Sequence, residues 1–124
     1  MSNVLLARNF KAEAAIPAFT LVKPGTVDGN VVAAAAVTDS IIGVTTDIPA
    51  ALGERADVIL AGVADVLYGG AVVRGDWLTC DASGRAVSAA PGAGVNNNVI
   101  GRALVSGVLG DVGSVSLSTN RIQG

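Results

Sequence analysis

Short apolar runs separated by glycine-containing polar segments dominate the pattern of this chain. The clearest run is residues 114–118, in which Val115 and Leu117 alternate with three serines. Side chains that alternate with period two point to opposite faces of a strand, so this run predicts a strand with one apolar face. Turn signals recur about every 8–12 residues, a spacing typical of a sandwich or barrel. The predicted strands are residues 20–23, 31–37, 41–46, 56–61, 63–68, 77–80, 86–89, 99–106 and 114–118.

Two pairs of these strands have the sequence signature of a β-hairpin. Strands 77–80 and 86–89 flank residues 81–85, where Gly84 is available for the positive φ of a tight turn. Strands 20–23 and 31–37 flank the polar segment 24–30 in the same way. Residues 92–98 have no phosphate-loop pattern and are interpreted as a flexible surface loop. The predicted fold class is therefore all-β, a compact β-barrel or sandwich.

An internal duplication is the most informative feature of the sequence. Residues 19–60 align with residues 76–117 at a shift of 57 positions. Two such halves can close around a shared core and leave fewer sheet edges exposed. The matching pairs are Leu21 with Leu78, Gly53 with Gly110, Val58 with Val115, Leu60 with Leu117 and, after one inserted residue, Ile42-Gly43 with Ile100-Gly101.

Residues 1–16 lie outside this repeat, so the predicted organisation is an N-terminal arm (1–16) and a single β domain (17–124). Residues 4–15 form either a short helix that Asn3 caps and that ends before Pro17, or an extended arm, because their apolar positions fit neither period. Two roles stay open for the segment. It either frays or docks on its own body, or it binds a partner.

Composition limits the chemistry that the chain can perform. Its 124 residues suffice for one domain with a core, and 51% are hydrophobic but only 3% aromatic, so small and β-branched side chains build that core. Cys80 is the single cysteine and histidine is absent. These counts exclude an internal disulfide, a cysteine-based metal cluster and a histidine-dependent triad. We expect no cofactor and no metal.

Charge and hydropathy argue against nucleic acid and membrane as partners. The net charge is −2, although residues 1–24 carry +2 and the remainder −4. Nucleic-acid binding requires a concentrated basic face, which is lacking. No apolar run approaches the roughly 18 residues of a membrane helix. The start of the chain has only a four-residue apolar run and no secretion signal, so a cytoplasmic site of synthesis is expected.

Acidic residues are the remaining candidates for catalysis, and most stand beside glycines or at strand ends, where aspartate is a turn former. A carboxylate pair for glycoside hydrolysis also needs stacking aromatics, which are scarce here, so we predict that the chain is not an enzyme. Trp77 is interpreted as a core anchor. The candidate acids are Asp47, Glu54, Asp57, Asp65, Asp76 and Asp81.

The order and spacing of the turn motifs resemble the small capsid decoration, or cement, proteins of tailed bacteriophages. The resemblance covers about residues 17–118 and lies in turn motifs, not in a catalytic signature. The residues that carry it are Gly62-Val63-Ala64, Gly69-Gly70-Ala71-Val72, Gly75-Asp76-Trp77-Leu78, Asp81-Ala82-Ser83-Gly84-Arg85-Ala86-Val87, Val99-Ile100-Gly101-Arg102-Ala103-Leu104 and residues 113–117.

This resemblance implies a β-tulip body, a homo-oligomer with a trimer favoured, and a role in stabilising the shell by bridging major capsid proteins. It implies a place on the capsid surface of the virion after assembly in the host cytoplasm. In several such proteins the N-terminal arm adds to a strand of the major capsid protein. The capsid-binding residues expected on that basis are Val4, Leu5, Leu6, Arg8, Phe10 and Lys11.

Two other functions stay open. The chain is either a different β-rich virion component, such as a head-fibre base, a tail protein or an adhesin module, or a small hydrolase or carbohydrate-binding domain. The position of the protein on purified particles separates the first from a capsid decoration protein. Glycan binding or turnover that depends on Asp76 would favour the second.

Overall fold

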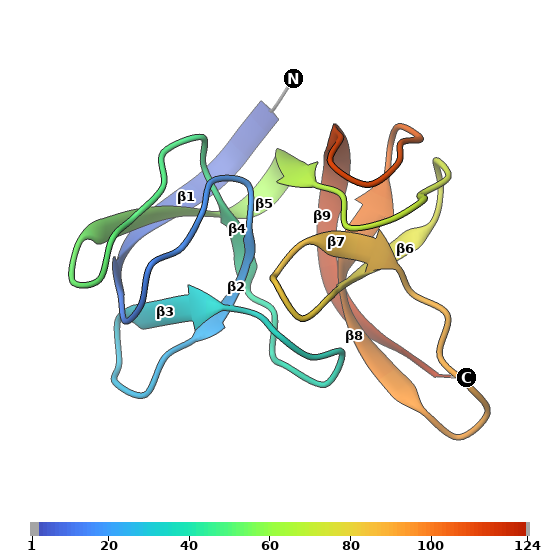
Figure 1. Cartoon of the computed structure of the whole chain (residues 1–124), viewed down its shortest axis with the longest axis horizontal. Coiled ribbons are helices and arrows are strands. Elements are labelled where there is room, and N and C mark those ends of the chain that lie inside the picture. Colours follow the sequence, from blue (N-terminus) through green and yellow to red (C-terminus); the bar gives the residue numbers. More distant parts are fainter. Residues whose placement is uncertain (1–2, 124) are drawn as a thin grey trace.

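The computed structural model describes residues 3–123, which form nine β-strands (Figure 1). Within this range there is no helix, and hence none long and apolar enough to cross a membrane. The all-β prediction is confirmed. The strands are β1 (Asn3–Ala12), β2 (Leu21–Pro24), β3 (Asn30–Ala33), β4 (Gly43–Thr45), β5 (Arg55–Leu67), β6 (Trp77–Cys80), β7 (Ala86–Ser88), β8 (Asn96–Ala103) and β9 (Val112–Gln123).

The predicted strands 56–61 and 63–68 are one continuous strand, β5. Gly62 adopts a φ of 103° but does not end the strand, because the residues on both sides of it find partners. Val63 pairs with Asn3 of β1 on one side and with Ser116 of β9 on the other. Backbone pairing therefore overrides the weak intrinsic strand preference of glycine.

Residues 96–98 begin strand β8, so their interpretation as part of a flexible loop was wrong. They pair with residues 121–123 of β9. The backbone N–H of Asn98 also donates to the carbonyl of Val37 at 2.8 Å. Its side-chain amide donates to the carbonyls of Thr38 and Asp39 at 3.0 and 2.9 Å. Pairing with β9, more than 20 residues further along the chain, therefore holds these asparagines in a strand, and Asn98 is also bonded to residues 37–39.

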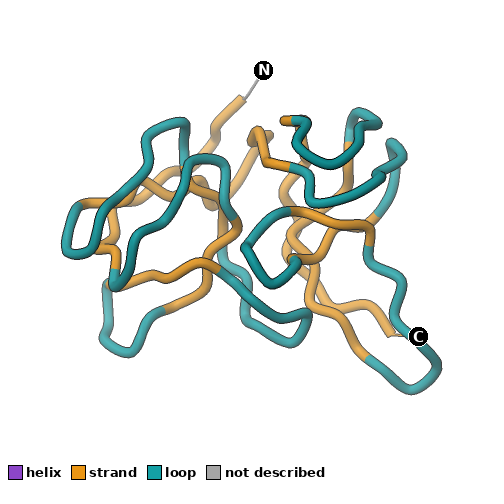
Figure 2. Tube along the Cα trace, in the orientation of Figure 1, coloured by secondary structure: helices purple, strands orange, loops and turns teal. Residues whose placement is uncertain are grey.

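The nine strands form one mixed sheet with the order β1-β3-β2-β4-β5-β9-β8-β6-β7. Strand β1 also pairs with β5, so the first five strands close into a ring. The β1–β3 pair is parallel, and the other pairs within the ring are antiparallel. Figure 2 shows this ring at the left and the remaining strands at the right, with β5 passing from one group to the other.

The second group repeats the pairings of the first, with the end of β5 in the position of β1. Residues 7–11 of β1 pair with residues 55–59, and residues 63–67 of β5 pair with residues 112–116 in the same register. The β6–β7 hairpin corresponds to β2–β3, β8 to β4, and β9 to the first part of β5. Residues 3–12 here dock on the body's own β5, and the separate arm (1–16) stays a prediction.

Gly43 and Gly101 explain the Ile-Gly motif that both halves share. A Cβ atom at Gly43 would collide with the carbonyl oxygen of Ile59, and one at Gly101 with that of Ser116. Each glycine therefore lets its strand, β4 or β8, approach the backbone of the long strand beside it. A side chain at either position would push the paired strands apart.

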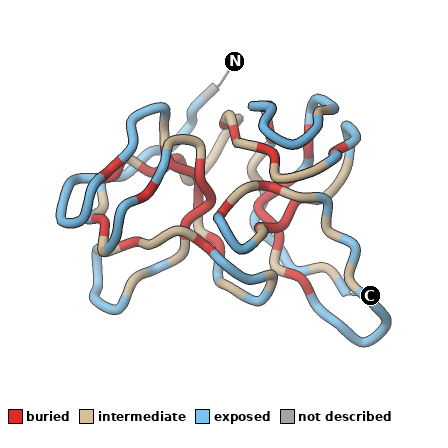
Figure 3. Tube along the Cα trace, viewed as in Figure 1, coloured by how far each residue is buried: buried red, intermediate tan, exposed pale blue. Residues whose placement is uncertain are grey.

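Two clusters of buried side chains form the core, shown in red in Figure 3. The smaller cluster lies within the first ring and includes Val31 and Val58. The larger includes Leu21 and Val44 of the first half and Leu78 and Ile100 of the second, so one core joins the halves. Hydrophobic burial is the main stabilising contribution of such clusters.

The aromatic anchor of the core is Tyr68, which is fully buried, and the interpretation of Trp77 as that anchor was wrong. Trp77 is half-buried, with the guanidinium of Arg102 4.3 Å from its ring centroid. Trp77 begins β6 and opposes Arg102 of β8. A cation above an indole face is a favourable contact at such a site.

Candidate binding surface

Strand β1 carries all six residues that the sequence analysis assigned to capsid binding, and five of them are exposed. Val4, Leu5 and Leu6 have exposed fractions of 43%, 78% and 54%. Arg8 and Lys11 are also exposed, whereas Phe10 is half-buried and packs against the core cluster of the first ring. The structure thus brings together an apolar end and a basic end on one strand. Their role in binding stays a prediction.

The apolar end of β1 is irregular. The register between β1 and β5 shifts between Val4 and Leu6 and again between Leu6 and Ala7, as in a β-bulge. A bulge breaks the alternation of a strand and turns consecutive side chains toward the same side. Exposure continues through residues 7–9, where the pairing is regular, so the whole segment from residue 4 to residue 9 lies at the surface.

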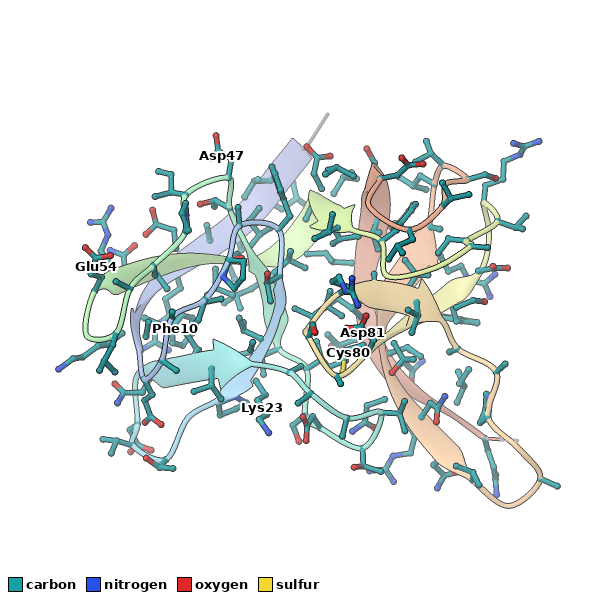
Figure 4. The ribbon with its side chains drawn as sticks, in the orientation of Figure 1. Phe10, Lys23, Asp47, Glu54, Cys80 and Asp81 are labelled. Carbon is teal, nitrogen blue, oxygen red and sulfur yellow. The ribbon has the colours of Figure 1, made fainter. Side chains whose placement is uncertain are left out.

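Basic and aromatic side chains combine at the other end of β1. The guanidinium carbon of Arg8 lies 4.9 Å from the centroid of the Phe10 ring. Both residues line a shallow pocket of about 340 Å³, closed on the other side by Ile42 and the β2–β3 turn, residues 24–30. Phe10, labelled in Figure 4, lies between β1 and this turn. The lining of this pocket therefore combines a cation, an aromatic ring and a polar turn.

A second shallow pocket, of about 320 Å³, lies at the apolar end of β1. Val4, Phe19 and Asp47 line it, together with residues 45–46, Ile59 and Asp65. Asp47 stands at the outer edge of the structure in Figure 4. Strand β1 therefore has a shallow concave surface at each end.

Phe19 has a left-handed backbone conformation, which the sequence does not predict for a residue other than glycine. Its φ is 55°, in the left-handed region that favours glycine. The backbone N–H of Phe19 donates to the carbonyl of Thr46, and its carbonyl accepts from the N–H of Leu67, both at 3.1 Å. These two bonds hold the strained residue between β4 and the end of β5.

The candidate catalytic carboxylates are engaged mainly in local structure. The carboxylates of Glu54, Asp76 and Asp81 accept backbone N–H groups of their own turns at 2.7–3.0 Å. Asp57 pairs with Arg55, and Asp65 accepts the hydroxyl of Ser114. These contacts are those of turn formers and strand neighbours. Within residues 3–123, no cluster of three metal-ligating side chains occurs.

Glu13 fastens the end of β1 to the β2–β3 turn. Its carboxylate accepts the backbone N–H of Thr26 at 2.8 Å, the side-chain amide of Asn30 at 2.9 Å and the N–H of Val27 at 3.2 Å. The bond from Thr26, followed by that from Asn30, lowers the pKa of Glu13 below its ordinary value of 4.5.

Cys80 is buried between the two halves, where its thiol donates to the carbonyl of Ala36 at 3.1 Å. Figure 4 shows it beside Asp81 on the side of the second half that faces the first. Burial, followed by the charges of Asp39 and Asp81, raises the pKa of this thiol to about 11. A nucleophile must be a thiolate, so Cys80 is not reactive at neutral pH.

Among solved structures, the fold matches the N base of the head fibre protein gp8.5 of bacteriophage phi29. The TM-score is 0.71, and the match covers 96% of this chain and 98% of that one, at 18% sequence identity. The two proteins share a fold. No family model matches the sequence. A search of curated proteins also finds no match.

Proposed function

We propose that this chain is a structural protein of a phage head, attached to the outer surface as the base of a head fibre. The observation that carries the proposal is the likeness to the phi29 head fibre base along almost the entire length of both chains. The likeness supports a head-fibre base better than it supports a capsid cement protein. A protein of this kind needs rigidity and a complementary surface, and it needs no catalytic chemistry.

Strand β1 is the surface that we propose for contact with the major capsid protein. Its Val4–Leu6 end exposes three neighbouring apolar side chains, and its other end carries Arg8 and Lys11. Exposed apolar side chains beside a basic rim are a composition suited to burial against another protein. A homo-oligomer, with a trimer favoured, stays a prediction, and light scattering of the purified chain measures it.

The proposal is tested with purified heads of the phage that encodes the chain. The labelled protein should co-sediment with heads and appear on their outer surface by electron microscopy. The triple variant Val4→Ser, Leu5→Ser, Leu6→Ser should bind more than tenfold more weakly while keeping its fold, because the backbone pairs with β5 remain. A control variant, Val95→Ser, removes an apolar side chain that is 47% exposed elsewhere and should bind normally.

Capsid cement is the second candidate, because the exposed apolar end of β1 is a surface suited to bridging capsid subunits. The two functions differ in how the absence of the chain changes the thermal stability of the shell. Heads that lack a fibre base should release their DNA at the same temperature as complete heads. Heads that lack a cement protein should release it at a lower temperature, because bound protein stabilises the shell by mass action.

A further inference from the structure

Two surface turns, residues 51–54 and 108–111, occupy the same position in the two halves and have the same hydrogen bonds. In each, the backbone N–H of the fourth residue donates to the carbonyl of the first at 3.0 Å. The carboxylate of that fourth residue, Glu54 or Asp111, accepts the N–H of the first at 2.7 or 3.0 Å. Each turn is thus closed from both sides.

The third residue of each turn ties it to the body. Gly53 and Gly110 have φ angles of 83° and 91°, which disfavour any other residue. The backbone N–H of Gly53 donates to the carbonyl of Ala12 at 2.8 Å, and that of Gly110 to the carbonyl of Tyr68 at 3.0 Å. The second residue of each turn is therefore held in a defined direction.

That second residue is a leucine in both turns, and both leucines are exposed. The exposed fractions are 72% for Leu52 and 61% for Leu109. A third turn, residues 73–76, has the same hydrogen bonds and a glycine with a φ of 95°, yet its second residue is Arg74. The turn conformation therefore does not require leucine.

Comparison of the two halves shows that Leu52 and Leu109 are identical without a reason inside the fold. Residues 46–60 and 103–117 align without a gap and have four identical pairs. Three pairs have a reason within the fold, namely a positive φ, burial, or packing against a core cluster. They are Gly53 with Gly110, Val58 with Val115 and Leu60 with Leu117. Only the exposed pair, Leu52 with Leu109, has no such internal reason.

We propose that Leu52 and Leu109 are equivalent contact points that dock into the same apolar depression on two neighbouring copies of one head subunit. The inference rests on the proposed function and names the partner in more detail. Two identical side chains on turns of the same conformation can occupy two identical sites, one on each copy of the partner. Figure 1 shows the turns at separate edges of the molecule, residues 51–54 at the left (green) and residues 108–111 at the upper right (red). Their separation favours contact with two subunits.

The surroundings of the leucines favour a protein partner over an anionic membrane. An acidic residue, Glu54 or Asp111, stands two positions after each leucine, and the chain has a net charge of −2. Anionic lipid headgroups would repel both sites. An apolar depression on a protein would bury the leucine and leave the neighbouring carboxylate at the rim, bonded to its own turn.

The test compares Leu52→Ser, Leu109→Ser and the double variant in binding to purified heads. Each single variant should bind about tenfold more weakly, and the double variant about a hundredfold, because the two contacts are separate and their losses add. The control is Val73→Ser, which removes a side chain that is 61% exposed in the third turn, residues 73–76. It should bind as the unmodified chain does.

Head subunits dissociated from the shell provide the second arm of the test. A single subunit offers one depression, so either leucine suffices, and each single variant should bind it within about twofold of the unmodified chain. The double variant should bind it about tenfold more weakly than the unmodified chain, with β1 as the remaining contact. Light scattering of the same variants should show an unchanged molecular mass.

Several outcomes would overturn the inference. They are normal binding of the double variant to heads, an effect of only one leucine, an equal effect of Val73→Ser, or loss of binding to dissociated subunits by a single variant. A change in molecular mass would show instead that the leucines join copies of this chain. Failure of the unmodified chain to bind heads would refute the proposed function itself, which distinguishes the two failures.

Discussion

The substitution Tyr68→Phe tests how the core holds the surface loop that carries Leu109. Tyr68 is fully buried, and its hydroxyl donates to the backbone carbonyl of Val105 at 2.8 Å. Its own backbone N–H and carbonyl bond to Asp111 and Gly110. One residue thus fixes residues 104–111 from the inside. Removing the hydroxyl keeps the ring and leaves the Val105 carbonyl without this donor.

The expected loss is about 1–2 kcal/mol, the range for a side-chain hydrogen bond whose partner is left partly buried. For a chain of this size it corresponds to a fall in Tm of about 4–8 °C. Hydrogen exchange of residues 104–111 should accelerate more than that of the first ring, because the bond is local. The control Thr119→Val removes an exposed hydroxyl of β9 and should change stability by less than about 0.5 kcal/mol.

The same residue gives a prediction for alkaline pH. Burial, followed by the charge of Asp111, raises the pKa of Tyr68 above its ordinary value of 10.0. The contribution of the neutral Tyr68 side chain to the free energy of unfolding is complete below pH 10. It declines as the pH rises toward the pKa of Tyr68 in the folded state, because the tyrosine of the unfolded chain ionises first. The chain has one tyrosine, so Tyr68→Phe removes this decline while retaining any from Cys80.

Urea titrations at neutral and alkaline pH measure both effects, with phenolate absorbance reporting the ionisation. The reasoning would be refuted if Tyr68→Phe had the same Tm as the unmodified chain at neutral pH. It would also be refuted if exchange in residues 104–111 were unchanged. Equal loss of stability by both proteins above pH 10 would contradict the role assigned to tyrosine ionisation.

Three further predictions concern acid, thiol reactivity and strand packing. Glu13→Gln should remove a contribution to the free energy of unfolding that is present above the ordinary carboxyl pKa and is lost as the pH falls through the lowered pKa of Glu13. The free energies of unfolding of the variant and of the unmodified chain should therefore converge in acid denaturation. Cys80 should resist a thiol reagent at neutral pH until the chain is unfolded, and fast labelling of the native protein would contradict its burial. Gly101→Ala should cost about 3 kcal/mol in urea denaturation, because the new Cβ meets the carbonyl of Ser116, and an unchanged midpoint would show that the strands adjust.

Local pattern was sufficient for much of the secondary structure. Period-two alternation predicted the strand at residues 114–118, which lies within β9. Glycine-containing turns predicted both hairpins, β2–β3 and β6–β7. These features depend on the conformational preferences of a few consecutive residues, which is the information that a single sequence carries.

The candidate surface was predictable only in part. The apolar run at residues 4–6 indicated a segment without a place in the core, and its side chains are exposed. The alignment of the halves contains Leu52 and Leu109, but their exposure cannot be read from it. A leucine in a sequence is expected to be buried, and only the position of the turn at the edge of the molecule makes it a surface residue.

The sequence by itself thus determined that this chain is built of strands and tight turns in two related halves. The tertiary structure alone decided that β1 closes a ring, that β5 serves both halves and that Tyr68 rather than Trp77 fills the core. It also decided that Phe19 takes a left-handed conformation. The physical reason is that these outcomes depend on hydrogen bonds and packing between residues distant in the chain, which local preference does not encode.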